Sequence, residues 1–347
     1  AYYYLVRLYG GCPFRTDKNR KEYNLAKSTP EQIYQFILDD LIYAAANAPE
    51  KARESGTPTR YAASALLSDV YLTLKKYDEA ATEAAKVINS NKYTLTKVAT
   101  ARDFDKVFGP DAASSEEVFY MKNENSTGND GWPYVMICAH PKAMVNGQHM
   151  LSTGIGWYGI YTTSDNEFIK NWDERDLRKE LNLLPFNFGL GDKTYLFSKY
   201  YDPNALGKNG AGNDWPVIRY PDVLLNYAEA VARKAGGATD DALEKLNTIR
   251  RRAYGLEPTA PSAMDYTMSD CPTLESFISL LVKEEGYECM NEAKRWMYLC
   301  RLGVVSERIE QYKGKEVKAK HMIWPIAVTE FNYNSEMDES KDQNPGY

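Results

Sequence analysis

The chain has 347 residues, a length that suggests roughly two domains or one large domain. Hydrophobic residues make up 44% and charged residues 26%, which is typical of a globular protein and excludes a disordered chain or a fibre. The net charge of −6 argues against nucleic-acid binding, because nucleic-acid binders usually carry a basic face. The 27 tyrosines, 11 phenylalanines and 6 tryptophans suit a protein that stacks on a ligand, although tyrosines also pack helical repeats.

Neither a membrane span nor a disulfide framework is visible in the sequence. No apolar run approaches the ~18 residues that a membrane span needs. The chain opens inside an apolar-periodic segment, AYYYLVRLYGG, so we expect the native N-terminus, with any address or lipid signal, to lie upstream. The five cysteines form no CxxC pair. Cys289 and Cys300 would lie about 16 Å apart on one predicted helix, too far for a disulfide, so the redox compartment stays open.

The sequence pattern predicts that residues 1–95 form a helical part of the fold. The run Thr29-Pro30-Glu31 supplies an N-cap, a proline in the first turn and an acid near the positive helix end. An apolar stripe then runs from Ala62 to Leu74 at helical spacing. The segment KKYDEA turns into a second helix with small residues on one side. This pattern is typical of a tetratricopeptide repeat, in which small residues let paired helices approach closely.

A second helical pair is predicted far downstream, at residues 219–234 and 240–252. The two helices are joined by AGGA, a glycine helix stop, and Thr239 or Asp240 caps the return helix. A long helical stretch is expected over residues 273–302, and the tail after His321 is expected to be extended. Residues 217–347 are therefore predicted to form a second helical part with an extended C-terminal tail.

The middle of the chain has a different character. Residues 96–216 are rich in Gly, Asn, Asp and aromatic residues, with short strands expected at 117–121 and 194–201 and a helix at 163–182. Loops held on a rigid frame are where binding sites usually lie. The predicted fold is mainly α: a tetratricopeptide-like helical scaffold with an inserted loop-rich ligand-binding region and few short strands.

Several segments together resemble the SusD/RagB family, the outer-membrane nutrient-binding lipoproteins of Bacteroidetes. The resemblance is carried by YYYLVRLYGGCPF, by TRYAASALLSDVYLTLKKYDEAATEAAKVINSNKYTL, by IRYPDVLLNYAEA with DDALEKLNTIRRRAYG, and by WPIAVTEFNYNSEMDESKDQNPGY. It spans nearly the whole chain. The chain departs from the family pattern where Gly286 replaces an Arg, Ala293 a Gly and Tyr298 an Asp. We therefore expect one ion pair of the family's helix to be absent.

The resemblance implies both an architecture and a role. Such proteins are similar to lids on a TonB-dependent outer-membrane transporter, to which they deliver oligosaccharides or, in some branches, peptides. The family is lipid-anchored at the cell surface through the first mature cysteine. None of the five cysteines of this chain can be that anchor, so the anchor is expected upstream.

Catalysis is the rival class of function. Glycoside hydrolysis needs two carboxylates about 5–9.5 Å apart, one of them with a raised pKa. Pairs such as Asp173 with Asp176 and Glu284 with Glu288 occur at helical spacing beside basic residues, as solvated or salt-bridged faces do. The chain is therefore predicted not to be an enzyme, and no catalytic residue is assigned.

Cofactor and metal motifs are equally weak. His140, His149 and His321 are scattered without zinc spacing, and the phosphate-binding and nucleophile-elbow motifs are absent. The oxygen-rich stretches 202–204 and 209–214 are interpreted as surface turns rather than a calcium site. No cofactor and no metal ligand is predicted, although a structural metal ion is left open.

The tryptophans divide into two groups by their context. Trp172 and Trp296 occur at helical spacing and Trp324 in an apolar run, so we expect all three to pack inside the fold. Trp132, Trp157 and Trp215 occur in loop contexts beside glycines, which let a partner approach closely. A loop tryptophan can also simply pin its loop to the domain.

A sugar ring presents an apolar C–H face and a rim of hydroxyls, so it needs an aromatic plane beneath it and polar side chains around it. A contact between rings contributes about 0.5–1.5 kcal/mol beyond area burial, and we assume a similar value for a sugar face. The predicted ligand-binding residues are Asp130, Trp132, Tyr134, Trp157, Tyr158, Tyr161, Asp214 and Trp215.

These observations predict a lipid-anchored cell-surface protein that captures oligosaccharides and delivers them to a TonB-dependent transporter. Three alternatives remain: a peptide receptor of the same family, a tetratricopeptide-type scaffold for protein partners, and a glycosidase. The sequence does not identify the glycan.

Overall fold

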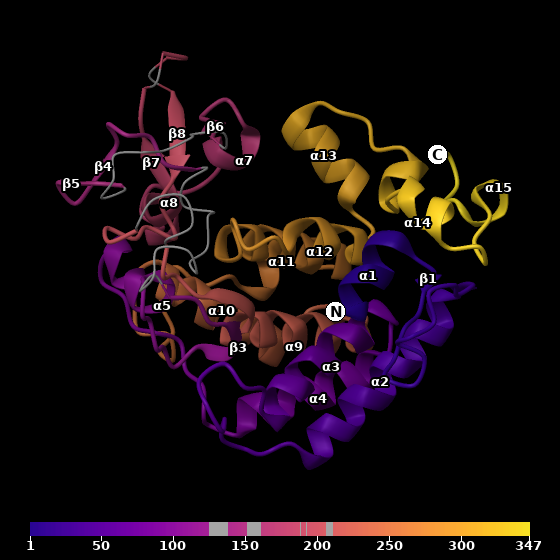
Figure 1. Cartoon of the computed structure of the whole chain (residues 1–347). Coiled ribbons are helices and arrows are strands. Elements are labelled where there is room, and N and C mark those ends of the chain that lie inside the picture. Colours follow the sequence, from indigo (N-terminus) through magenta and orange to yellow (C-terminus); the bar gives the residue numbers. More distant parts are fainter. Residues whose placement is uncertain (125–137, 151–160, 188, 192, 206–210) are drawn as a thin grey trace. The chain divides into compact units, whose positions relative to one another are not determined.

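The computed structural model describes residues 1–124, 138–150, 161–187, 189–191, 193–205 and 211–347. The fold is mainly helical, with small antiparallel sheets of two or three short strands, as the sequence predicted (Figure 1). Contacts group the chain into a first unit, residues 1–46 with 296–347, and a second unit, residues 47–295. The division into 1–95, 96–216 and 217–347 stays a prediction.

The first unit brings the two ends of the chain together. Its elements are α1 (Tyr2–Tyr9), β1 (Cys12–Pro13), β2 (Lys27–Ser28), α2 (Pro30–Asn47), α12 (Arg295–Leu302), α13 (Val305–Lys313), η4 (Ala319–Met322), α14 (Val328–Tyr333) and α15 (Glu339–Asp342). The Thr29 hydroxyl accepts a hydrogen bond from the Gln32 N–H at 3.3 Å, which confirms the expected start of α2. The Asn344 amide donates to the carbonyls of Tyr9 and Trp324 and ties the C-terminal residues to the end of α1.

Two expectations for this unit were wrong. The tail after His321 is not extended throughout, because it contains the short helices α14 and α15. Trp324 was expected in the core, but 46% of it is exposed. Its backbone N–H donates to the Leu8 carbonyl at 2.7 Å, and its ring makes an edge-on contact with the Tyr9 ring. Trp296, expected to pack inside the fold, is half-buried.

The second unit is built on the two predicted helix pairs. These are α3 (Arg60–Thr73) with α4 (Tyr77–Asn89) and α9 (Tyr220–Ala235) with α10 (Asp240–Ala253), followed by η3 (Met268–Asp270) and α11 (Leu274–Glu288). Ala80 and Ala230 are fully buried between α4 and α9, where their small side chains let the helices approach. Helix α9 ends at Gly236 with φ of 75°, a left-handed conformation that favours glycine, and the Thr239 hydroxyl caps α10.

Between the helix pairs lies a segment of short elements. They are η1 (Ala101–Phe104), α5 (Asp105–Phe108), β3 (Glu117–Met121), β4 (Met144–Val145), β5 (Gln148–His149), β6 (Thr162–Thr163), α7 (Glu167–Lys170), α8 (Leu177–Asn182), β7 (Leu183–Pro185), β8 (Thr194–Phe197) and β9 (Trp215–Arg219). The strand at 117–121 was predicted and pairs antiparallel with β9. The strand expected over 194–201 ends at Phe197, and the helix expected over 163–182 is two short helices, since Asp176 caps a new one.

The sheet β6–β8–β7 alternates its side chains between two hydrophobic clusters. Leu184 and Leu196 pack on one side, whereas Leu183 and Phe197 pack on the other, as the two-residue period of a strand requires. The second cluster also contains Trp172, which is 2% exposed and stacks on Tyr287 with ring centres 4.2 Å apart. The core position predicted for Trp172 is confirmed.

A buried network of ion pairs joins the helical frame of the second unit to the inserted segment. Its carboxylates are Glu116, Asp176, Asp222, Glu284, Glu288 and Glu292, and its cations are Arg178, Lys199, Arg219, Arg250, Arg252 and Lys294. The two sets are equal in number, so the charges of the network are balanced, although Asp222, Arg250 and Lys294 at its margin are only partly buried. Balance matters because an unpaired charge in the interior is very costly.

Arg219, at the end of β9, is the centre of this network. Its Nη1 lies 2.9 Å from Glu288 Oε1 and 3.1 Å from Glu116 Oε2, and its Nη2 lies 2.6 Å from Glu292 Oε1. Arg252 from α10 bridges Glu116 and Glu288 at 2.8 and 2.5 Å. Arg219 therefore connects β9 with α11 and with Glu116, the residue that precedes β3.

The inserted segment reaches the same network through two cations. Arg178 on α8 pairs with Asp176 at 2.6 Å and with Glu284 on α11 at 2.8 Å. Lys199, just after β8, pairs with Glu292 at 2.5 Å. The pairs Asp173/Asp176 and Glu284/Glu288, weighed in the sequence as catalytic candidates, are thus bound to basic side chains. Glu284 and Glu288 are buried rather than solvated.

At Gly286, where the family pattern has an arginine, the guanidinium of Arg295 packs against the helix. A Cβ at Gly286 would lie 2.8 Å from the Phe168 ring and 2.9 Å from the Arg295 guanidinium. Arg295 crosses α11 at this point and donates to the Val282 carbonyl and the Glu285 carboxylate. An arginine from the next segment therefore supplies a guanidinium beside the helix, and the missing side chain makes room for it.

Acid is expected to destabilise the second unit through Glu288. Burial alone would raise the pKa of this carboxyl, but Arg252, Arg219 and Arg178 outweigh it and lower the pKa from 4.5 to about 2. Because the pKa is lower in the folded state, this stabilisation is present above pH 4.5 and is lost as the pH falls toward 2. Melting temperatures measured across this range should fall steadily.

The matched variant is Glu288→Gln. At neutral pH it leaves buried guanidinium groups without their partner and should cost about 3–5 kcal/mol of stability. Glu275→Gln, the same change at an exposed position of the same helix, should cost far less. An unchanged urea midpoint for Glu288→Gln would contradict the importance of the network.

Ala293 offers a stabilising test, since the family pattern has a glycine there. Its φ is 54°, a left-handed conformation that costs an L-residue roughly 1–2 kcal/mol. We expect Ala293→Gly to raise the stability by about 1 kcal/mol. Ala81→Gly, inside helix α4, should instead lower it by about 1 kcal/mol. Denaturation of the two variants in urea distinguishes relief of strain from a general effect of glycine.

Candidate ligand-binding site

Three of the eight predicted ligand-binding residues lie in the described part of the structure. These are Tyr161, Asp214 and Trp215. The other five, Asp130, Trp132, Tyr134, Trp157 and Tyr158, lie outside the described residues. The described part of the predicted site therefore consists of Tyr161, Asp214 and Trp215 and the elements that carry them.

Trp215 does not lie in a loop, as its sequence context suggested, but begins strand β9 opposite Met121 of β3. Its half-buried ring lies nearly parallel to Tyr200, with centres 6.1 Å apart and planes at 25°. Tyr200 in turn meets the edge of Phe108 at 5.6 Å. The glycine and asparagine residues before Trp215 suggested a loop in the sequence. The strand was not recognised because β3, with which it pairs, is far away in the sequence.

Asp214 holds the end of the strand pair together. Only 7% of it is exposed, and its carboxylate lies 2.7 Å from Lys122 Nζ and accepts the Asn123 N–H at 2.9 Å. Burial lowers the pKa of Lys122, but hydrogen bonds to Asp214 and Glu117 outweigh it and raise the pKa overall. Asp214 thus fixes the backbone at the start of β9, the strand that begins with Trp215.

Tyr161 lies on a different element from Trp215. It immediately precedes β6, whose Thr162 pairs with Tyr195 of β8, and 43% of Tyr161 is exposed. The sheet β6–β8–β7 that follows Tyr161 is itself held by the two hydrophobic clusters. Tyr161 is therefore an aromatic side chain displayed to solvent on a supported strand end.

Sequence reasoning missed two cavities of the second unit. One, of about 740 Å³, lies beside the segment 93–97 that follows α4. The other, of about 460 Å³, lies beside Trp172, Tyr254 and Tyr287. Tyr161, Asp214 and Trp215 are not among the described residues that line either cavity. The signal available in the sequence was the cluster of tyrosine, threonine and lysine in YTLTK at residues 93–97.

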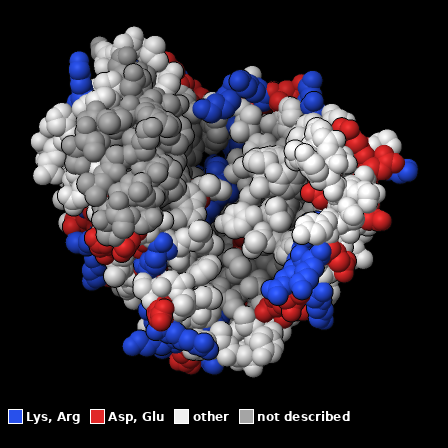
Figure 2. Space-filling model, in the orientation of Figure 1, with Lys and Arg blue, Asp and Glu red and all other residues white. Residues whose placement is uncertain are grey.

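Basic and acidic side chains are interspersed on the visible surface of the described residues. On the face shown in Figure 2, basic and acidic side chains of the described residues lie in small mixed groups rather than as one basic surface. Within the described ranges, no helix is long and apolar enough to cross a membrane, and no group of three His, Cys, Asp or Glu is placed to hold a metal ion. The five cysteines, all of which the structure describes, form no disulfide with one another.

The family is established by comparison with known proteins. A family model described as the SusD family matches residues 111–347, and one described as "Starch-binding associating with outer membrane" matches residues 1–72. The first match covers more than half of the chain, which therefore belongs to the SusD family, a family of binding proteins without catalytic activity.

Individual relatives match over almost the entire chain. SusD-like protein P2 of Formosa agariphila is 26% identical over 379 positions, which cover 100% of this chain and 72% of that protein. The crystal structure of a SusD homologue from Bacteroides thetaiotaomicron has a TM-score of 0.79 at 22% identity and covers 100% of this chain and 76% of its own. A laminarin-binding SusD-like protein has a TM-score of 0.74 at 21% identity, with coverage of 100% and 76%.

The structural role of Asp214 can be tested directly. Asp214→Ala removes two hydrogen bonds to a buried carboxylate and should cost about 1.5–3 kcal/mol. Asp165→Ala serves as the control, because Asp165 is an exposed acid 3.7 Å from the exposed Lys193, and such surface pairs contribute little. Thermal denaturation of both variants is the measurement. Equal melting temperatures for the two would show that Asp214 does not hold the strand end.

Proposed function

We propose that this protein captures oligosaccharides at the cell surface and delivers them to a TonB-dependent transporter of the outer membrane. The observation that carries the proposal is the SusD family match over residues 111–347. The match of residues 1–72 to a starch-binding family associated with the outer membrane supports the location. The fold shared with a laminarin-binding protein supports an oligosaccharide as the ligand. An N-terminal lipid anchor upstream of this chain would hold it there.

Capture would rest on aromatic rings held in fixed positions. The Trp215 ring is supported by Tyr200 and by the strand end that Asp214 secures, so little conformational freedom would be lost on binding. Tyr161 presents a second ring from the edge of another sheet. We propose that Asp130, Trp132, Tyr134, Trp157 and Tyr158 complete the site with further rings and a carboxylate.

The expected affinity suits a protein that must release its ligand. Each stacking contact contributes about 0.5–1.5 kcal/mol beyond the burial of area. Two or three such contacts, together with polar contacts at the rim, correspond to a Kd in the micromolar to millimolar range. A transporter could remove a ligand held at this strength by mass action. No covalent step is needed.

The proposal is tested by titrating an oligosaccharide panel, with maltohexaose and laminarihexaose included, into the purified chain. Trp215→Ala should weaken binding of the responding sugar by about tenfold, the equivalent of roughly 1.4 kcal/mol. Trp215→Phe, which keeps an aromatic plane, should retain most of the affinity. Trp324→Ala removes an exposed tryptophan of the first unit and should have no effect. Isothermal titration calorimetry provides the affinities.

The same titration discriminates the alternatives. Binding of peptides but of no oligosaccharide would favour a peptide receptor and overturn the proposal. Turnover of a bound oligosaccharide would contradict a purely binding role. Capture of a TonB-dependent transporter from outer membranes by the immobilised chain would support delivery, whereas capture of unrelated proteins alone would favour a scaffold.

A further inference from the structure

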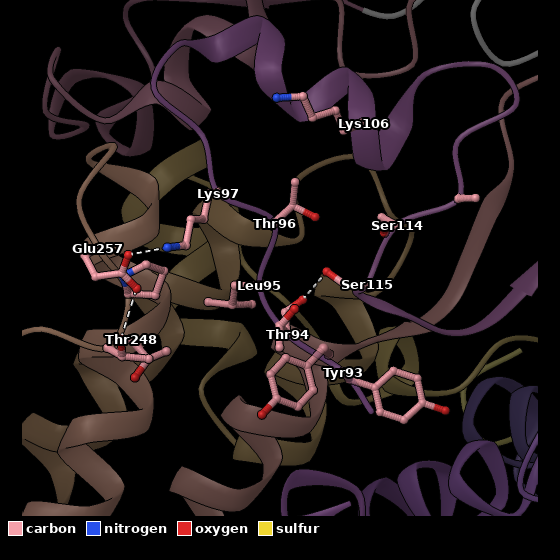
Figure 3. A pocket seen from close by; sticks show the side chains of 14 residues that line it. Tyr93, Thr94, Leu95, Thr96, Lys97, Lys106, Ser114, Ser115, Thr248 and Glu257 are labelled. Carbon is pink, nitrogen blue, oxygen red and sulfur yellow. Dashed lines mark hydrogen bonds and ion pairs between the residues drawn. The ribbon is translucent and has the colours of Figure 1, made fainter. Parts of the chain in front are cut away.

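The larger cavity of the second unit has the dimensions of a ligand site. Its volume of about 740 Å³ falls within the 300–1,000 Å³ that is usual for small-ligand pockets. Six described parts of the chain line it: residues 93–97 after α4, Lys106 of α5, the loop 113–115 before β3, Tyr220 at the start of α9, Thr248 of α10 and the loop 257–259 (Figure 3). We refer to it as the 93–97 cleft.

Two tyrosines form the aromatic part of the 93–97 cleft. The rings of Tyr93 and Tyr220 are 6.3 Å apart between centres and inclined by 24°, and Tyr61 meets the edge of Tyr93 at 6.1 Å. Both tyrosines that line the cleft are half-buried and pack against a cluster that includes Ala62 and Val223. Their rings are therefore held in place while part of each remains accessible.

Hydroxyl groups make up much of the remaining lining. The residues that carry them are Thr94, Thr96, Ser114, Ser115, Thr248 and Thr259. Two of the wall segments are joined to each other, since the Thr94 N–H donates to the Ser115 carbonyl at 3.1 Å and the Ser115 hydroxyl donates to the Thr94 carbonyl at 2.9 Å (Figure 3). An aromatic floor with a hydroxyl-rich wall matches a sugar, which has one apolar face and a polar rim.

The charges of the 93–97 cleft favour a neutral ligand. Lys97 pairs with Glu257 at 2.5 Å across the cleft, as Figure 3 shows, and Lys106 pairs with Asp103 at 2.8 Å. Both lysines that line the cleft thus already have a carboxylate partner. An anion bound to either lysine would lie close to the carboxylate that already pairs with it and would be repelled, whereas a neutral sugar hydroxyl meets no such repulsion.

The wall of the cleft is fixed by the buried ion network. The Thr96 N–H donates to Glu116 Oε1 at 2.8 Å, and Glu116 is bound by Arg219 and Arg252. The segment 93–97 is therefore attached to the most constrained part of the second unit. A ligand that enters the cleft meets groups that are already ordered, which lowers the entropic cost of binding.

We propose that the 93–97 cleft is a second carbohydrate site that binds a neutral oligosaccharide, separate from the site at Trp215 and Tyr161. An anionic ligand is disfavoured because each lysine among the described lining residues is already paired with a carboxylate, which would repel a second negative charge. The inference rests on the proposed function only for the class of ligand. A glucan bound in the cleft would lie against Tyr93 or Tyr220 and exchange hydrogen bonds with the Thr and Ser hydroxyls.

The test is a variant that fills the cleft without touching the buried core. Ala113 lines the cleft and is exposed, so Ala113→Trp should occupy the cavity and leave the melting temperature unchanged. Ala235→Trp is the matched control, because Ala235 is an exposed alanine at the far end of the helix that begins with Tyr220. Maltohexaose and laminarihexaose at millimolar concentration are the probes, and isothermal titration counts the sites.

We expect Ala113→Trp to reduce the number of bound oligosaccharides from two per chain to one, whereas Ala235→Trp leaves two. Should Ala113→Trp fail to fold, Glu257→Ala removes one exposed lining group and should weaken the second event about fivefold. Hydrogen exchange provides an independent measurement: the probe should protect residues 93–97 and 113–115 in the wild-type chain and in Trp215→Ala alike.

Each remaining outcome overturns the inference in a recognisable way. A single binding event that is lost in Trp215→Ala but unchanged in Ala113→Trp leaves the proposed function intact and removes the second site. Protection confined to segments other than 93–97 and 113–115 does the same. If neither glucan binds the wild-type chain, the cleft proposal is overturned. The proposed function is tested separately by the broader oligosaccharide panel.

Discussion

The interaction on which the second unit depends is the contact of Arg219 with three buried glutamates. Arg219 ends β9 and begins the motif that leads into α9, so it lies where the inserted segment returns to the helical frame. Its partners are Glu116, which precedes β3, Glu288 at the end of α11, and Glu292 in the segment after α11. A buried guanidinium tolerates no displacement from its carboxylates, since each unpaired charge would be left in a low-dielectric interior. The returning chain is therefore held in one place.

This constraint explains how a segment of short strands and helices can be positioned without a large sheet of its own. Arg178 and Lys199 fasten the inserted segment to α11 and to Glu292, and Glu116 fastens the wall of the 93–97 cleft. Both the Trp215 strand and the cleft are attached to the same charges. A helical frame that supplies charged anchors can thus hold both the Trp215 strand and the wall of the 93–97 cleft in place.

The helices could be predicted because their signals are local. The spacing of apolar residues, the cap at Thr29 and the glycine stop at Gly236 each act within one or two turns. The errors at Trp215 and Trp324 fall where contacting residues are distant in sequence, whereas the error over 163–182 has a local cause. Trp215 was assigned to a loop because β3 lies about a hundred residues before it, and Trp324 was placed in the core although its neighbours cover only part of it. The predicted helix at 163–182 failed because Asp176 starts a new helix and binds Arg178.

The sequence by itself determined the helical frame and the family resemblance, because periodicity, caps and ordered motifs are local features of the chain. It also predicted aromatic side chains as the groups that would contact a sugar. Only the tertiary structure decided that Glu284 and Glu288 are buried anchors, that Asp214 secures a strand end and that six hydroxyls and two tyrosines surround one cavity. The physical reason is that charge pairing and cavity formation depend on which residues meet in space, and separation along the chain does not encode that directly.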